Sequence, residues 1–285
     1  MNTQYSLFKQ FTIDLQSFVR QNSTLIENTL SNVFTMRLVG NKTHGDLAEI
    51  GMTEFVNQFL PGYKAQHVGK DLFRAKTSEE DILVTRLIDK KTIKVSLKAY
   101  GDGPLQLSTD KDAVLFPLLE SQGKCKIDDQ NEIRSLLNRP DFLHLSDINV
   151  LPLIYRENNM QCAIMVFDIT AIAELTSVVE RVKPGARGRK HPVWVFRDAA
   201  GDYICEVRYG GKAANALQRG LWTNTKTAAK HFRFITDGWI AYEHNLIITE
   251  LFAKALNSTV ESHKKALQSI TGELQKLADQ ADISL

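Results

Sequence analysis

Cysteine is scarce in this sequence of 285 residues, which contains only Cys125, Cys162 and Cys205. The three cysteines are far apart, odd in number and without a Cys-x-x-Cys pair, so we expect no zinc site and a reduced, cytoplasmic setting. No apolar run reaches the roughly 18 residues that a membrane span needs, and the N-terminal residues contain no signal-peptide core. The sequence therefore predicts a cytosolic protein.

A strong imbalance of charge is also missing. The sequence has 35 Lys and Arg residues against 33 Asp and Glu residues, a formal net charge of +2. Such a mild charge does not identify a nucleic-acid partner, and it does not exclude one, because acidic metal ligands and surface carboxylates offset a basic groove. With 43% hydrophobic residues, the chain can bury a large core as an ordinary soluble globular protein.

Hydrophobic periodicity predicts an α/β fold, read as one mixed unit over residues 1–285. Apolar residues at three- and four-residue steps predict helices over residues 5–34, 47–60, 110–119, 169–182 and 245–279. Apolar runs bounded by turn residues predict strands over residues 63–68, 81–88, 92–99, 150–155, 162–167, 192–197 and 203–208. Asp46 is expected to cap the second helix, and residues 101–104 and 183–191 are expected to be loops.

Acidic residues open the strand predicted over 81–88, and a lysine closes the strand predicted over 92–99. Neighbouring strands with this layout can aim the Asp81 carboxylate and the Lys98 ammonium at one metal-bound phosphate. Phosphodiester hydrolysis needs an activated water, neutralised phosphate charge and help for the departing oxygen, which carboxylate-bound Mg²⁺ supplies. The sequence therefore predicts Asp81 as a Mg²⁺ ligand and Lys98 as the residue that polarises the phosphate or the attacking water.

A second carboxylate is required, because Ser96 takes the catalytic position where an acid would stand, two residues before the lysine. Glu49 on the preceding helix is the first candidate, followed by Asp110 and Asp112 at the start of the next helix. Each has a plain structural alternative. Glu49 could be a solvated helix residue, and the two aspartates could be helix-start carboxylates favoured by the helix dipole. His44 could act as a general base, but a histidine beside a helix start is more often structural or a phosphate contact, and we expect one of these roles.

At these residues the sequence resembles the PD-(D/E)xK nucleases, in particular type II restriction endonucleases. Glu80-Asp81-Ile82 stands where the family has its proline-aspartate pair, and Ser96-Leu97-Lys98 where it has acid-x-lysine. Residues 96–109 and 208–223 also look like segments of these enzymes, and the likeness covers about residues 40–112 and 192–235. The departure at Ser96 is similar to a family variant, which implies that Asp112 or Asp110 replaces the missing acid.

The resemblance implies a mixed central sheet flanked by helices, with additional N- and C-terminal helices. It implies a catalytic core at about 40–125 and a DNA-recognition part at about 183–235. It also implies a Mg²⁺-dependent, site-specific cut of double-stranded DNA that leaves 5′-phosphate ends, a homodimer, and a cognate DNA methyltransferase in the same restriction-modification system. Two other interpretations stay open: a DNA-binding protein that no longer cleaves, and a repair or mobile-element nuclease.

Long amide and guanidinium side chains follow the strand predicted over 203–208, and such side chains form paired hydrogen bonds with base edges. A helix over 212–221 would place Asn215, Gln218 and Arg219 on one face, although it could equally be a polar surface helix packed through its leucines. The basic loop predicted over residues 183–191 could contact phosphates, or it could be a solvated surface loop. The residues predicted to bind DNA are Gln106, Arg187, Arg189, Lys190, Lys212, Asn215, Gln218, Arg219, Trp222, Thr223 and Lys226.

Overall fold

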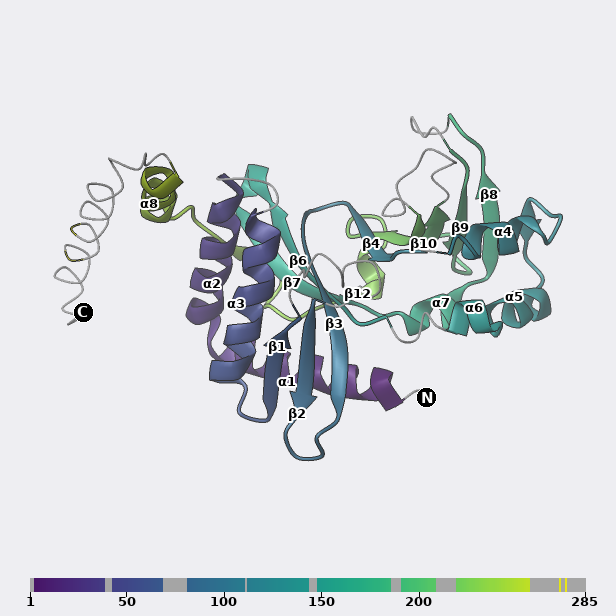
Figure 1. The fold of residues 1–285 in the computed structure, drawn as a ribbon. Coiled ribbons are helices and arrows are strands. Elements are labelled where there is room, and N and C mark those ends of the chain that lie inside the picture. The colour runs from purple at the N-terminus through teal and green to yellow at the C-terminus, as the bar shows by residue number, and fades with distance from the viewer. Residues whose placement is uncertain are drawn as a thin grey trace.

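The computed structural model describes residues 3–38, 43–68, 81–110, 112–143, 148–185, 191–208 and 219–256, together with Gly272 and Gln275. It is a mixed α/β fold with two sheets (Figure 1). The first sheet contains, in order, β1 (Tyr63–His67), β2 (Ile82–Arg86), β3 (Thr92–Gly101), β6 (Val150–Arg156), β7 (Gln161–Phe167) and β12 (Phe232–Phe234), with β13 (Ile240–Ala241) also on β7. The second contains β4 (Pro104–Ser108), β11 (Gly220–Asn224), β10 (Tyr203–Arg208), β9 (Val193–Arg197), β8 (Val178–Val182) and β5 (Lys126–Ile127).

The first sheet changes direction at β3. Strands β1, β2 and β3 form an antiparallel meander, whereas β3 and β6 run parallel, from Ser96 opposite Val150 to Gly101 opposite Tyr155. Parallel neighbours need a long crossover connection. Here the crossover contains β4, so the chain leaves β3, enters the second sheet and then returns to the first.

Strands β6 and β7 are buried on both faces, and their alternating side chains belong to two cores. On β7, Cys162 and Ile164 pack with the N-terminal helices, while Ala163 and Met165 pack toward the second sheet. This explains why residues 150–155 and 162–167 are almost continuously apolar. The helices on the first side are α1 (Thr3–Gln21), α2 (Ser23–Thr35) and α3 (Thr43–Phe59), with the 3-10 turn η1 (Met36–Leu38) after α2.

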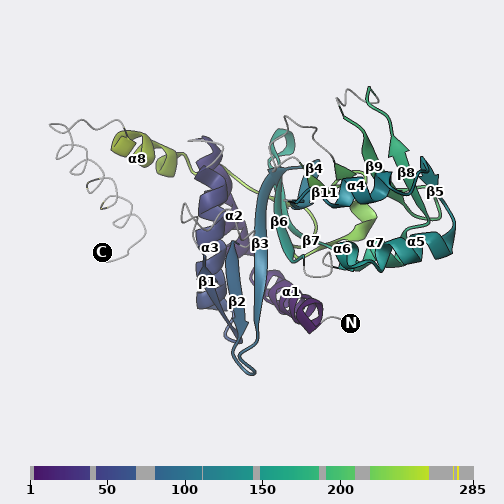
Figure 2. The same cartoon turned by 45° about the vertical axis from the view of Figure 1, so that its right-hand side comes forward.

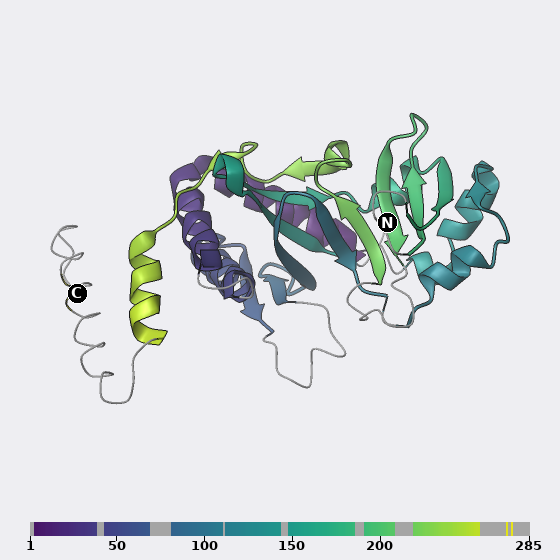
Figure 3. The same ribbon diagram turned by 90° about the horizontal axis from the view of Figure 1, so that it is seen from above.

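The second core lies between β6–β7, the inner face of the second sheet and a group of short helices (Figure 2). Trp194 and Phe196 of β9 are fully buried there. The short helices are α4 (Leu115–Glu120), α5 (Gln130–Leu137), α6 (Pro140–Leu143) and α7 (Thr170–Leu175). The second sheet and α8 (Leu246–Leu256) lie at opposite ends of the molecule (Figure 3).

The predicted α/β class and each of the seven predicted strands are confirmed, within one or two residues at most ends. The helix predicted over 169–182 is wrong in its second half. It ends at Leu175, Thr176 is extended, and the β-branched run from Val178 forms strand β8. Helix α3 begins at Thr43, so Asp46 lies in its first turn and is not its cap. The predicted helix at 110 begins only at Leu115.

Several elements were not predicted, notably β4, α5 and β11, so one expected central sheet is in fact two. The helix expected over 212–221 is contradicted at its end, because Gly220 and Leu221 belong to β11. Its residues 212–218 lie outside the described residues, as does most of the helix expected beyond Leu256. Among the residues that are described, no helix is both long and apolar enough to cross a membrane.

Gly220 generates a test of the second sheet. Its φ is +110°, and a Cβ there would lie 2.2 Å from the Ser108 carbonyl oxygen and 2.6 Å from the Asp110 amide nitrogen. We expect Gly220→Ala to lower the free energy of unfolding by about 3 kcal/mol, because backbone atoms cannot move aside cheaply. Denaturant unfolding measures this loss. Gly62→Ala is the control, since nothing lies within 4 Å of its Cβ position, and an equal loss in both variants would contradict the pairing of β4 with β11.

Candidate active site

Asp81 lies immediately before β2, and its side chain is held by β3. Its Oδ2 atom accepts hydrogen bonds from the Leu97 amide at 2.6 Å and from the Ser96 hydroxyl at 3.0 Å. The Asp81 amide in turn donates to the Val95 carbonyl at 3.1 Å. The carboxylate therefore has a fixed orientation, and Ser96 is one of the groups that fix it.

Lys98 lies on the face of β3 that turns away from the first core. Val95 and Leu97 are buried in that core, so Ser96 and Lys98 share the opposite face by strand alternation. Lys98 and Asp81 line the same pocket, and the positive charge of Lys98 opposes the rise that burial causes in the pKa of the Asp81 carboxyl. The predicted pair thus comes together across the β2–β3 hairpin.

A pocket of about 580 Å³ opens at this pair. Its walls come from α3, β3, β6 and the segment after α2. The polar side chains that line it are those of Arg37, His44, Asp46, Glu49, Asp81, Lys98, Tyr100 and Tyr155. The structure therefore brings Asp81, Lys98 and Glu49, the three strongest candidates from the sequence analysis, to one pocket.

Three carboxylate residues, Asp46, Glu49 and Asp81, line this pocket, and the charge of Glu49 affects the acidity of Asp81. Burial is the largest cause and raises the pKa of Asp81, and the negative charge of Glu49 raises it further. Lys98 and the hydrogen bonds from Leu97 and Ser96 oppose this rise, but the net pKa stays above the ordinary value. Ionised Asp81 is therefore short of compensating positive charge, which is the condition that a bound cation would relieve.

Glu49 is buried on α3 and contacts a histidine that the sequence analysis missed. Its Oε2 atom lies 3.2 Å from Nε2 of His67, at the end of β1. The signal was available in the strand pattern, because Tyr63, Ala65 and His67 alternate on one face and the first two are buried. His67 is thus positioned to orient the Glu49 carboxylate.

His44 and Tyr155 form the wall beside Lys98. The His44 Nε2 atom lies 3.2 Å from the Ala99 carbonyl oxygen, and its ring meets the Tyr155 ring edge-on with centroids 6.0 Å apart. His44 is buried in the first turn of α3, not in a loop. This agrees with the structural role that the sequence suggested for it.

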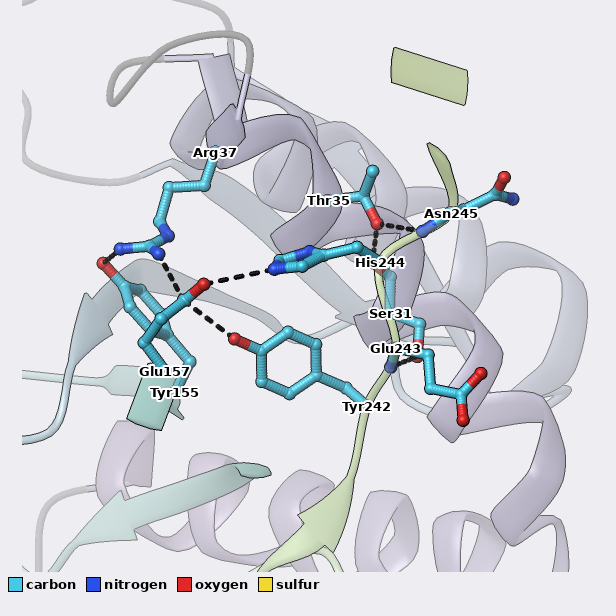
Figure 4. A network of polar contacts seen from close by, with 9 residues as sticks. All are labelled: Ser31, Thr35, Arg37, Tyr155, Glu157, Tyr242, Glu243, His244 and Asn245. Carbon is cyan, nitrogen blue, oxygen red and sulfur yellow. Dashed lines mark hydrogen bonds and ion pairs between the residues drawn. The ribbon is translucent and has the colours of Figure 1, made fainter. Parts of the chain in front are cut away.

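Arg37 and Glu157 hold Tyr155 in place (Figure 4). The Arg37 guanidinium donates to the Tyr155 hydroxyl at 3.1 Å, stacks 4.4 Å from its ring centroid and pairs with Glu157. Glu157 also accepts a hydrogen bond from Tyr242 at 2.9 Å and lies 3.1 Å from His244. Burial would raise the pKa of Glu157, but these hydrogen bonds and the Arg37 charge outweigh it and lower the pKa. The pocket wall is therefore fixed by charge-assisted contacts.

Asp110 and Asp112 do not join the pocket. The Asp110 carboxylate accepts hydrogen bonds from the Val114 and Leu115 amides at 2.9 and 2.8 Å, so it binds the backbone at the start of α4. Asp112 is exposed in the turn that follows. Both lie beyond β4, whose five residues span about 17 Å, on the far side from Gly101 at the pocket. In the described part of the chain, no group of three or more His, Cys, Asp or Glu residues is arranged to hold a metal ion.

The residues predicted to read DNA are only partly described. Arg187, Arg189, Lys190, Lys212, Asn215 and Gln218 lie outside the described residues, as do Glu79 and Glu80. Thr223 is fully buried and donates to the Ile204 carbonyl at 2.8 Å, so it supports the second sheet from within. Gln106 is nearly buried and donates to the Arg219 carbonyl at 3.0 Å.

Arg219, Trp222 and Lys226 are the predicted DNA contacts that the structure leaves at least partly exposed. Trp222 is partly exposed on β11, beneath the Arg208 guanidinium. Lys226 is exposed and lines a second pocket of about 580 Å³, which shares Gly101 and Tyr155 with the first. Lys226 therefore lies on a surface that continues from the candidate active site.

The raised pKa of Asp81 predicts how charge at this site affects stability. At pH values between the ordinary and the raised pKa of Asp81, its carboxyl is protonated in the folded protein and ionised in the unfolded chain. The free energy of unfolding therefore falls as the pH rises through this interval. Asp81→Asn removes this loss and keeps both hydrogen bonds from β3. In the absence of divalent metal, we expect its Tm to exceed that of the unmodified protein by about 2 °C or more at pH 7, and by less near pH 4.

Asp89→Asn is the control for this experiment, because the Arg86 hydrogen bond lowers the pKa of Asp89 and its charge stabilises the fold. Its Tm should not rise at pH 7. Differential scanning calorimetry over this pH range measures both variants. A lower Tm for Asp81→Asn at pH 7 would contradict the electrostatic description of the pocket.

Comparisons with known proteins identify no relative of this chain: no protein-family model matches the sequence, and no curated protein and no solved structure matches it.

Proposed function

We propose that this protein is a Mg²⁺-dependent endonuclease that cuts double-stranded DNA at a short specific site, as type II restriction enzymes of the PD-(D/E)xK superfamily do. The observation that carries the proposal is the pocket lined by Asp81 just before β2, Glu49 of α3 and Lys98 of β3. Carboxylates that can hold a divalent metal, with a cation beside them, are groups suited to metal-dependent phosphodiester hydrolysis. The mixed sheet flanked by helices is compatible with that superfamily.

The donor set of the pocket fits Mg²⁺. Asp81 and Glu49 offer carboxylate oxygens, the ligands that hard divalent cations prefer. Burial and then the charge of Glu49 raise the pKa of Asp81, and a bound cation would favour its ionised form. In this assignment Glu49 from α3 supplies the acid that is missing at Ser96, in place of Asp110 or Asp112.

Each residue of the pocket has a distinct role in the proposed reaction. Asp81 and Glu49 would hold the metal, which lowers the pKa of a water and neutralises phosphate charge. Ser96 and the Leu97 amide keep the Asp81 carboxylate in one orientation, and His67 does the same for Glu49. Lys98 donates to a phosphate oxygen or orients the water whose in-line attack on phosphorus expels the 3′ oxygen.

Cutting both strands of a duplex requires two active sites, so the proposal includes a homodimer with the N-terminal or C-terminal helices as candidate interfaces. It also includes a cognate methyltransferase that protects host DNA. Both follow from the resemblance. A repair or mobile-element nuclease with the same pocket would prefer ends, flaps or mismatches over a fixed sequence.

A DNA-binding protein without cleavage is the second candidate, and two points favour it. In the family resemblance Ser96 stands where an acid is expected, and within the described ranges no group of three or more His, Cys, Asp or Glu residues is arranged to hold a metal. Such a protein would bind DNA equally well after Asp81→Ala and would never nick it. Cleavage assays therefore separate the two candidates.

The proposal predicts that Lys98→Ala lowers the rate of Mg²⁺-dependent cleavage by a factor of about 100 or more, because it removes charge stabilisation at the phosphate. Asp81→Ala should abolish cleavage. The assay uses long unmethylated plasmid and phage DNA, with Mg²⁺ or with chelator, and the products are discrete fragments. Lys94→Ala is the matched control, since Lys94 is on the same strand and face, about 13 Å along β3. We expect its fragments and rate to be unchanged.

Two results would contradict this proposal. Absence of cleavage by the unmodified protein, with DNA binding intact in all variants, would leave the non-catalytic binder. Equal cleavage rates of the unmodified protein and Lys98→Ala would show that Lys98 does not take part in the reaction, which contradicts the proposed active site.

Metal binding gives a second, independent prediction. Mg²⁺ or Ca²⁺ at a concentration 100-fold above Kd should increase the free energy of unfolding of the unmodified protein by about 3 kcal/mol and so raise its Tm. The rise should shrink as the pH falls, because the ligand carboxylates must be ionised. Asp81→Asn should show no metal-dependent rise, whereas Asp110→Asn should keep it. A metal-dependent rise in Asp81→Asn equal to that of the unmodified protein would exclude Asp81 as a ligand.

A further inference from the structure

Arg208 on β10 is held by two neighbours on the outer face of the second sheet. Its Nε atom donates to Oε1 of Glu206 at 2.5 Å, and its guanidinium carbon lies 4.1 Å from the centre of the Trp222 ring. The Glu206 side chain is 0% exposed, whereas that of Arg208 is 27% exposed. A guanidinium that is anchored through Nε and stacked on an indole has little rotational freedom left.

The second core does not account for this arrangement. Cys205 and Val207 of β10 point into that core, so Glu206 and Arg208 lie on the opposite face by strand alternation. An ion pair with a fully buried carboxylate pays a desolvation cost that its attraction barely repays, so it is a poor device for stability alone. Fixing the orientation of the Arg208 guanidinium is a use that does explain it.

A pocket of about 470 Å³ lies on this face, and Arg208 and Glu206 line it. Arg197 lines the same pocket and is anchored similarly: its Nε donates to Glu180 at 2.6 Å and its Nη1 to the Gly201 carbonyl at 3.1 Å. Tyr203 adds a polar ring to the same lining. The guanidinium groups of Arg197 and Arg208 therefore line one pocket, each held in a fixed orientation.

This pocket belongs to a row that begins at the candidate active site. The first two pockets share Gly101 and Tyr155. The second is lined by Thr225 and Lys226, and the third by Asn224 and Thr227 of the same turn. A bound duplex that reaches the candidate active site would therefore continue along the outer face of β10 and β11.

We propose that Arg208 reads a guanine of the DNA site, with Glu206 and Trp222 as positioning residues. The contact with Glu206 uses Nε, so the Nη groups can meet O6 and N7 of guanine, the paired acceptors that arginine reads in the major groove. Arg197 would contact a neighbouring base or phosphate. This inference rests on the proposed function for its partner, double-stranded DNA, and it adds a residue that reads the sequence.

The test selects duplexes from a random-sequence DNA pool in the presence of chelator, so that binding is measured without cleavage. The unmodified protein should select a motif that contains guanine. Arg208→Lys keeps the charge but loses the planar fork, so it should weaken the preference for one guanine by about 10-fold or more and keep the non-specific, salt-dependent affinity. Glu206→Gln should weaken the same position, since it loosens the arginine that does the reading.

Arg181→Lys is the matched control. Arg181 is also 27% exposed and anchored through Nε, to Glu120 at 2.7 Å, but it lies on the side of the second sheet that α4 covers. The Arg181→Lys variant should select the same motif as the unmodified protein. An unchanged motif and strength in Arg208→Lys, with Tm values showing that both variants fold, would overturn the assignment of Arg208. So would the absence of any selected motif. Failure of the proposed function appears elsewhere, as absence of Mg²⁺-dependent cleavage by the unmodified protein.

Discussion

The Asp81 carboxylate is tied to β3 through the Leu97 amide and the Ser96 hydroxyl, and the rest of the pocket is arranged around this attachment. The bonds fix the start of β2 against the strand that carries Lys98. They also hold a half-buried charge beside Glu49, which raises the pKa of Asp81. Electrostatic cost at a site of this kind is typical of function, because a bound cation turns the repulsion into attraction.

The parallel pairing of β3 with β6 connects this pocket to the surface where we place DNA recognition. Parallel strands need a long crossover connection. Here the crossover from β3 to β6 begins after Gly101 with β4, which belongs to the second sheet. One continuous segment thus lies at the pocket and at the edge of the recognition face. On the other side, Glu157 joins Arg37, Tyr242 and His244, so the turn after β6 and the segment before α8 are held together (Figure 4).

The sequence predicted the local elements of this site well. Apolar runs bounded by turn residues predicted both strands, and the places of Asp81 and Lys98 at the ends of these strands predicted that the two residues meet. The second sheet could not be foreseen, because β4 pairs with β11, more than one hundred residues later, and such pairings have no local signal. Asp110 was ambiguous for another reason: a carboxylate that binds the backbone at a helix start and one that binds metal have the same sequence signature, and only its bonds to Val114 and Leu115 separate them.

The most direct test of the central claim is a crystal structure with Mn²⁺ in place of Mg²⁺, in which anomalous scattering locates the metal. Mn²⁺ binds carboxylate oxygens as Mg²⁺ does. Our account predicts a peak in the pocket of Asp81 and Glu49, with both carboxylates as ligands and Lys98 beside them. A metal bound at Asp110 or Asp112, or a Lys98 amine that occupies the place between the two carboxylates and leaves the pocket without metal, would contradict it.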